Sequence, residues 1–559
     1  MIRGFEAHKI RKQLELDGLW EFSTCAGDHK DEVYKITVPS CWESHPKFSN
    51  YRGKALYRNS LEAEGNIRLV FKGVSHTAKV IFDNRIAVEH YNAYTQFETI
   101  IKNVGCGLHS IEVEVDNSFN EDSALHIPND YQSYGGISRP VIVEFLPDIF
   151  IKYVHFTPTY EDRGWFGNVT VEIENLSHKA HDAKIMIELN DNKYVFPITN
   201  IQGLETIKLS EKFKFENVEA YELESPKLYM LKTKLYMDGI EQALDDLIER
   251  IGFREVLIQG KDILFNGKKL NIKGFCRHED HPLFGCSLPY QALDYDINLM
   301  LDMGANAVRT SHYPNDELFL DLCDEKGLLV WEESHARGLT EESMKNKNFD
   351  IQSENCIREM IVNHYNHPSI LIWGILNECA SETEYGKKCY AKQFDQIKQL
   401  DKSRPTTFAS CKIKNDISLG LPDVISFNAY PGWYEDASES EYIKEIYDWV
   451  QKDTEGNCKP FIISEIGAGA IYGYRTPTSV KWSEERQASI LKKQLEAVFS
   501  QQEIVGAFIW QFCDIRVSEE WFSMRPRTMN NKGIVDEFRR RKLSYDIVRN
   551  IFMTISNYK

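Results

Sequence analysis

Two glutamates, Glu378 and Glu465, each close a short apolar run of the sequence. The runs, residues 368–378 and 460–465, are rich in Ile, Leu and Phe and lack a helical period, which is typical of buried strands in a parallel sheet. Carboxyl groups at the ends of two such strands would meet at one mouth of a barrel. One could protonate a glycosidic oxygen while the other attacks the anomeric carbon or activates water. A lone strand-end glutamate is usually a solvated residue, so the pair carries the interpretation.

Asn377 directly precedes Glu378 and supports the same chemistry. An amide beside the carboxyl group could donate to a sugar 2-hydroxyl, and this hydrogen bond strengthens as oxocarbenium character develops. Spacing alone does not force the assignment of the pair, because Glu332 and Glu333 end another apolar run.

Strands and helices alternate after residue 254, which predicts the frame that would hold these groups. The expected strands are residues 270–275, 305–310, 328–333, 370–376, 406–410, 424–428, 461–464 and 505–511. Amphipathic helical stretches lie between most of them, at residues 290–303, 316–325, 353–365, 384–400, 442–452 and 484–499. Eight strands alternating with helices predict a (β/α)₈ barrel over residues 254–559. Residues 411–421 are too short and irregular for a full helix.

The first 253 residues show alternating strands separated by turn signals, which is typical of antiparallel sandwiches. The expected strands are residues 67–72, 78–82, 111–115 and 141–145, and then 169–174, 184–189 and 228–236. A break near Pro147 divides two modules, residues 1–147 and 148–253. The size of the second module fits an immunoglobulin-like sandwich.

Other polar and aromatic residues follow the expected barrel strands and should gather at the same mouth. They are His278, His312, Asn428, Tyr430, Tyr434 and Trp510. Both histidines could instead be structural, and Trp510 could fill the barrel. A metal site built from residues 278–281 is disfavoured, because consecutive residues point in alternating directions and rarely converge on one ion. We therefore expect no metal.

Composition excludes several classes of partner. The formal charge is 66 − 84 = −18, which argues against nucleic acid and anionic membranes as partners. The twelve cysteines form no C-x-x-C pair and no Cys/His array, so they are interpreted as thiols in a reducing compartment. The N-terminus has no apolar signal region, and no stretch approaches the length of a membrane span. These features predict a cytoplasmic protein.

Several segments together resemble glycoside hydrolase family 2, and most closely its β-glucuronidases. The matching segments are residues 274–280, 306–314, 366–369, 377–378, 428–434, 464–467 and 510–514. The resemblance implies a jelly-roll sandwich, an immunoglobulin-like sandwich and a (β/α)₈ barrel in that order. It also implies that residues 130–140, with Asp130, reach from the first sandwich toward the active site. Relatives are usually homo-oligomers, so a dimer or tetramer is expected, with no organic cofactor.

By this resemblance Glu378 is the general acid/base and Glu465 the nucleophile of a retaining double displacement. The two carboxyl groups should then lie roughly 5–5.5 Å apart. Glu378 must be protonated at the start, so its pKa should be raised, and Glu465 must be ionised to attack.

Residues 525–533 are expected to read the sugar. They bring Arg527, Asn530 and Lys532 together in an acidic chain, and fixed cations beside amide donors suit a sugar carboxylate. Asn530-x-Lys532 resembles the Asn-x-Lys signature with which β-glucuronidases hold the C6 carboxylate. Whether Arg525 or Arg527 contacts that carboxylate is left open by the sequence.

Three functions follow for testing. The first is an exo-acting β-glucuronidase. The second, on the same fold, is a β-galactosidase or β-galacturonidase, because the orientation of the sugar C4 hydroxyl cannot be read from these residues. The third is a non-catalytic carbohydrate-binding protein, which would need neither glutamate nor Asn377.

Overall fold

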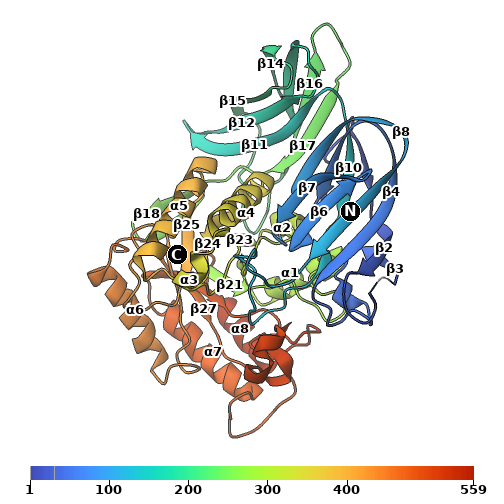
Figure 1. Cartoon of the computed structure of the whole chain (residues 1–559). Helices are drawn as coiled ribbons and strands as arrows, with labels where there is room; N and C mark the ends of the chain where they lie inside the picture. Colours follow the sequence, from blue (N-terminus) through green and yellow to red (C-terminus); the bar gives the residue numbers. More distant parts are fainter. Residues whose placement is uncertain (1, 31) are drawn as a thin grey trace.

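The computed structural model describes residues 2–30 and 32–559, which form two β-sandwiches and one barrel (Figure 1). In the figure the first sandwich is blue, the second is cyan to green, and most of the barrel runs from green to red. The order of predicted domain types is confirmed. Among the described residues, no helix is both long and apolar enough to cross a membrane.

The first sandwich is an antiparallel sheet built on two long strands, β4 (Lys54–Phe71) and β8 (Phe97–Asp116). The two strands pair along nearly their whole length, from Lys54–Asp116 to Phe71–Phe97. Different neighbours border their two halves, so the sheet folds over a shared apolar core. The neighbours are β1 (Lys12–Glu15), β2 (Gly18–Thr24), β3 (Tyr34–Val38), β6 (Thr77–Phe82), β7 (Arg85–Tyr91) and β10 (Val141–Leu146).

The second sandwich packs a three-stranded sheet against a four-stranded sheet, as expected for an immunoglobulin-like domain. The first sheet contains β11 (Ile149–Glu161), β12 (Gly164–Asn175) and β15 (Thr206–Phe215). The second contains β13 (His181–Leu189), β14 (Asn192–Ile201), β16 (Tyr229–Met237) and β17 (Asp245–Ile251). Alternate residues of these strands, such as Ile185 and Ile187, are buried between the sheets.

Eight parallel strands close into a barrel, as predicted. They are β21 (Ile272–Cys276), β22 (Ala307–Thr310), β23 (Leu329–Glu333), β24 (Ile370–Ile375), β25 (Thr406–Ser410), β26 (Ile425–Asn428), β27 (Phe461–Ile466) and β28 (Ile504–Ile509). Every residue of these strands is buried, which explains why the sequence shows them as continuous apolar runs.

Helices surround the barrel and cover its strands. They include α1 (Tyr290–Asp302), α2 (Glu317–Lys326), α3 (Glu341–Met344), α4 (Phe349–His364), α5 (Glu384–Leu400), α6 (Glu439–Asp453), α7 (Glu484–Phe499) and α8 (Leu543–Phe552). In α5 the residues buried against the barrel follow a helical period, from Gly386 and Tyr390 to Phe394 and Ile397. Residues 411–424, all described, contain no helix, as their irregular sequence predicts.

The first sandwich is joined to the barrel by buried ion pairs close to the barrel mouth. Arg139 donates to Glu279 Oε2 at 2.9 Å and to the Pro314 carbonyl at 2.9 Å. Because Arg139 ends the segment of residues 130–140, this pair fixes that segment against the barrel and holds Asp130 at the mouth.

Candidate active site

A cavity of about 450 Å³ opens at the carboxyl ends of the barrel strands. It is polar and is closed on one side by the first sandwich. Its lining includes Asp130, Arg337, Glu378, Cys411, Lys412, Asn428, Tyr430, Tyr434, Glu465, Trp510, Arg525 and Lys532. The structure therefore brings most of the predicted residues into one place.

Glu465 lies inside β27, where the pairing register with both neighbouring strands shifts. Such an irregularity re-aims a side chain, and here the carboxyl group lines the cavity. Its Oε1 accepts from Arg309 Nη1 at 2.9 Å, and its Oε2 accepts from the Tyr430 hydroxyl at 2.5 Å. Both carboxyl oxygens are held, so the orientation of the group is fixed.

Burial raises the pKa of Glu465 to about 7, against the lowering effect of Arg309. Glu378 raises this pKa further, because a second carboxylate disfavours the charged form. The expected ionised form of Glu465 therefore dominates only above about pH 7. The charge of the Glu465 carboxyl group therefore changes near neutral pH.

Glu378 follows β24 and faces the same cavity. Its Oε1 accepts from Asn428 Nδ2 at 2.9 Å, and Arg337 Nη2 lies 3.5 Å from its Oε2. Its backbone N–H donates to the Ala409 carbonyl of the next strand, which fixes the position of the loop. Each carboxyl group has two such contacts, but one of the Glu378 contacts is long at 3.5 Å, so the Glu378 carboxyl group is held less firmly than that of Glu465.

Asn377 is buried and shares a hydrogen-bond donor with each of the two carboxyl groups. Its Oδ1 accepts from Arg309 at 2.8 Å and from Asn428 at 3.2 Å. Among the described residues its Nδ2 has no hydrogen-bond partner. A buried donor without a partner is unusual, and Asn377 directly precedes Glu378, which lines the cavity.

Cations surround Asp130 at the sandwich side of the cavity. Its carboxyl group lies 3.1 Å from Arg337 Nη1, and it accepts from Arg525 at 2.8 Å and from Asn530 at 3.2 Å. These cations hold the pKa of Asp130 well below its usual range although burial raises it. Because Arg337 also lies 3.5 Å from Glu378, the two arginines face two carboxyl groups here.

Lys532 adds another cation to this side of the cavity. Its Nζ donates to the Tyr434 hydroxyl at 2.7 Å and lies 5.2 Å from the centre of the Tyr430 ring. Burial raises the Tyr434 pKa, but Lys532 and Arg525 together lower it by more, so the net shift is downward.

Two family models match the chain in the order of its domains. The model of the TIM barrel domain of glycosyl hydrolases family 2 matches residues 256–557, and the model described as glycosyl hydrolases family 2 matches residues 149–254. Together they cover most of the chain. It belongs to glycosyl hydrolases family 2. The chain is therefore a glycoside hydrolase, and its mostly β N-terminal part and C-terminal barrel follow the family architecture.

Individual relatives agree with the family. A solved β-galacturonidase of Eisenbergiella tayi, bound to galacturonate, is 54% identical, covers 100% of both chains and superposes with a TM-score of 0.98. A β-glucuronidase of Streptococcus agalactiae is 27% identical, with 98% of each chain covered. A solved β-glucuronidase of Faecalibacterium prausnitzii is 25% identical, with a TM-score of 0.86 over 99% of this chain and 100% of the other.

The two predicted histidines of this family 2 hydrolase lie beneath the cavity. His278 Nδ1 lies 3.1 Å from the Tyr313 hydroxyl, and His312 Nδ1 lies 2.8 Å from Glu333 Oε1. Burial lowers the pKa of each well below its usual value, so both rings are neutral. His312 stacks on Trp510 with ring centres 4.9 Å apart. Both histidine rings pack against Trp510, which lines the cavity.

Arg527 lies apart from the other predicted residues. It forms an ion pair with Glu537 and does not line the cavity, whereas Arg525 does. The backbone of Arg527 has a left-handed φ of 61°, so the chain turns sharply there and its side chain points elsewhere. The structure thus places Arg525, in place of Arg527, beside Asp130.

Glu332 and Glu333, the other acidic candidates, are buried away from the cavity lining. Glu332 Oε1 lies 2.8 Å from His364 Nδ1, on the side of α4. Glu333 accepts from Arg309 at 2.9 and 3.0 Å and positions that arginine.

Arg309 and Arg337 are site residues that the sequence analysis missed. Arg309 lies within an apolar strand, inside a matching family segment, and links Glu333, Asn377 and Glu465. Arg337 lies four residues after β23 and reaches both Asp130 and Glu378. A cation directly after or within a barrel strand is the signal that could have identified both, because catalytic groups concentrate at those strand ends.

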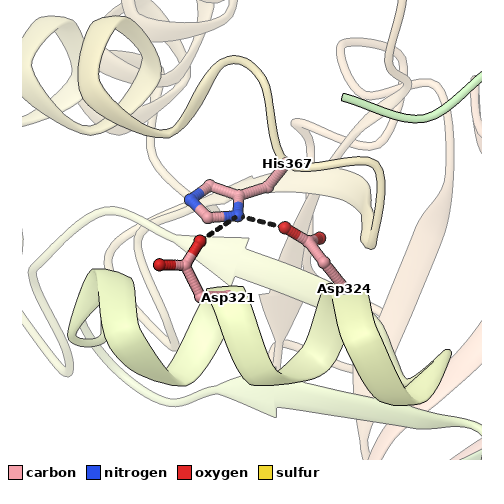
Figure 2. A group of neighbouring side chains, drawn as sticks. All are labelled: Asp321, Asp324 and His367. Carbon is pink, nitrogen blue, oxygen red and sulfur yellow. Dashed lines mark hydrogen bonds and ion pairs between the residues drawn. The ribbon is translucent and has the colours of Figure 1, made fainter. Parts of the chain in front are cut away.

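The residues once considered for a metal do not converge. Glu279 pairs with Arg139, and Asp280 accepts from the Tyr134 hydroxyl at 2.8 Å. Another group is formed by Asp321 and Asp324 of α2 and by His367, which precedes β24 (Figure 2).

That group is better described as an ion-pair network. His367 Nδ1 lies 2.6 Å from Asp324, and this carboxylate raises the His367 pKa although burial lowers it. Asp321 already accepts from Arg3 at 3.0 Å through both of its oxygens. The carboxylates of this group therefore have partners within the chain, Arg3 for Asp321 and His367 for Asp324.

Proposed function

We propose that this family 2 hydrolase is a retaining, exo-acting β-uronidase whose preferred substrate is a β-galacturonide. The observation that carries the proposal is the cavity that joins Glu378 and Glu465 to Arg525 and Lys532. Two carboxyl groups supply the hydrolytic chemistry, and fixed cations at the other side suit a sugar carboxylate. Arg525 already pairs with Asp130. Lys532, however, donates only to the neutral Tyr434 hydroxyl among the described residues, and a neutral hexose would leave it without an anionic partner.

In the proposed reaction Glu465 attacks the anomeric carbon, and Glu378 gives its proton to the leaving oxygen. A covalent glycosyl-enzyme forms, and Glu378, now ionised, takes a proton from the water that releases the sugar. Arg309 stabilises the ionised form of Glu465 that this attack requires. In this proposal Asn377 Nδ2, which has no partner among the described residues, donates to the sugar 2-hydroxyl.

Sequence identity to known relatives supports our choice of galacturonide over glucuronide as the preferred substrate. The sequence analysis put glucuronide first, but the carboxylate-binding cations do not distinguish the two sugars. The 54% identity to a β-galacturonidase over the whole chain favours galacturonide over the glucuronide of relatives near 27% identity. A β-glucuronidase is therefore the second candidate. The cytoplasmic location, the homo-oligomer and the domain boundaries stay predictions from sequence.

Hydrolysis of three p-nitrophenyl β-glycosides tests the proposal: the galacturonide, the glucuronide and the galactoside. The wild-type enzyme should cleave the galacturonide best and the galactoside least. Glu465→Gln should abolish cleavage, and Lys532→Met should reduce cleavage of the uronides far more than that of the galactoside. Preference for the galactoside, with Lys532→Met without effect, would contradict the uronide assignment but keep the hydrolase.

A further inference from the structure

Two thiols from different domains, Cys41 and Cys286, are in contact 3.3 Å apart. Cys41 precedes a short turn of the first sandwich, and Cys286 lies in the loop that follows β21 of the barrel. Cys41 is buried, while Cys286 is partly exposed. The packing around them is tight, because a Cβ added to Gly285 would lie 2.9 Å from Cys41 Sγ.

We propose that Cys41 and Cys286 form a reversible oxidation site that ties the first sandwich to the barrel. The two sulfur atoms need to approach by only about 1.3 Å to reach a disulfide bond length of about 2.0 Å. A cavity of about 240 Å³ lies nearby and is lined by Tyr134 and by Gly285, the residue before Cys286. Burial raises the pKa of Cys41, so the more exposed Cys286 reacts first.

The chemistry balances with a peroxide as oxidant. The Cys286 thiol reacts with hydrogen peroxide to give a sulfenic acid and one water. The Cys41 thiol then attacks that sulfur, and the disulfide forms with release of a second water. Two electrons pass from the thiols to the peroxide. A dithiol such as dithiothreitol returns the pair to thiols and is itself oxidised.

A disulfide between Cys41 and Cys286 would also restrain the segment of residues 130–140, which carries Asp130. The backbone on both sides of Cys41 bonds to this segment: Ser40 N donates to the Ile137 carbonyl at 2.8 Å, and Trp42 N donates to the Gly135 carbonyl at 3.0 Å. In the same segment the Tyr134 hydroxyl reaches Asp280 of the barrel. A disulfide would add a covalent link beside this hydrogen bond and hold the sandwich side of the cavity in place.

Peptide mapping tests the proposal. The full-length enzyme is treated with hydrogen peroxide, its remaining thiols are alkylated, and it is digested with trypsin without reductant. Cleavage after Lys and Arg gives residues 36–47 and 278–309, and each peptide holds one cysteine. We expect these two peptides to be joined, and dithiothreitol to separate them. Recovery of both peptides separately, with each thiol alkylated, would overturn the proposal.

Matched variants complete the test. Cys286→Ser and Cys286→Ala should lose the joined peptide, while Cys106→Ser, at an exposed thiol, should keep it. Oxidised wild-type enzyme should retain activity after heating to a higher temperature than reduced enzyme, and the Cys286 variants should show no such difference. A joined peptide without this thermal difference would contradict the tie between the domains.

Discussion

Arg309 Nη1 lies 2.9 Å from Glu465 Oε1, so a buried guanidinium contacts the proposed nucleophile directly. The same guanidinium donates to Asn377 and Glu333. One side chain therefore links the proposed nucleophile, the amide beside the acid/base and a supporting carboxylate. Since both charges are buried, their mutual attraction affects the charge state of Glu465 more than a surface pair would.

The first prediction concerns pH. Glu465 must be ionised to attack, and its pKa is raised to about 7, so kcat/KM should fall as the pH drops below about 7. Arg309→Met removes the cation that lowers this pKa, and the acidic limb should then move to higher pH. Arg309→Lys keeps the charge and should leave the limb closer to that of wild type. A limb at the same pH in all three enzymes would contradict this role of Arg309.

The second prediction compares two neighbouring arginines. Arg525 donates to Asp130 and lines the cavity, whereas Arg527 pairs with Glu537. Arg525→Met should lower kcat/KM on a β-uronide by about 10- to 100-fold, the effect of a lost charge-assisted hydrogen bond of ~1.5–3 kcal/mol. Arg527→Met should change it by less than about 3-fold, as expected for a partly exposed pair. The reverse order would restore Arg527 as the carboxylate contact.

The fold was predictable because its strands are either fully buried or strictly alternating. Residues 406–410 were placed correctly, since each residue of β25 is buried and the run ends in polar residues. The ends of α5 were also correct, because Thr383 caps its start and its apolar period is regular. The short helix α3 and the C-terminal α8 were not predicted. α3 is too short for a period to show, and α8 has only ten residues and directly follows the basic residues 539–542.

The site could be predicted only where a residue's type and its position at the end of an apolar run indicate its role. Glu378 and Glu465 end apolar runs, and the structure brings them into one cavity. Arg309 lies within β22, and the sequence does not show that its partners Glu333, Asn377 and Glu465 come from three other strands or strand ends. The choice between Arg525 and Arg527 depends on a turn in which Arg527 and Thr528 both have left-handed φ, and the sequence marks neither position with glycine.

The third prediction concerns Arg337, which lies between Asp130 and Glu378. Its contact with Asp130 is 3.1 Å and its contact with Glu378 is 3.5 Å, so it should act mainly on the sandwich side of the cavity. Arg337→Met should raise KM for β-uronides with good and poor leaving groups alike. Arg337→Lys should recover part of the loss. A defect confined to poor leaving groups would show instead that Arg337 acts through the acid/base.

The last prediction concerns the stability of the seam between the second sandwich and the barrel. Gly327 ends α2 with a φ of 70°, and a Cβ added there would lie 2.0 Å from the Leu223 carbonyl oxygen. Gly260 has a φ of 60° but has no atom within 4 Å of such a Cβ, so it is a control for backbone conformation alone. Gly260→Ala should lower the free energy of unfolding by about 1–2 kcal/mol, because a residue with a side chain is strained in the left-handed conformation. Gly327→Ala should lower it by at least ~2 kcal/mol more, because the loop of Leu223 must also move away from α2. Thermal unfolding followed by circular dichroism would measure the loss of stability in each variant. Equal decreases in Tm for the two variants would show that the Leu223 loop moves away from residue 327 at no cost.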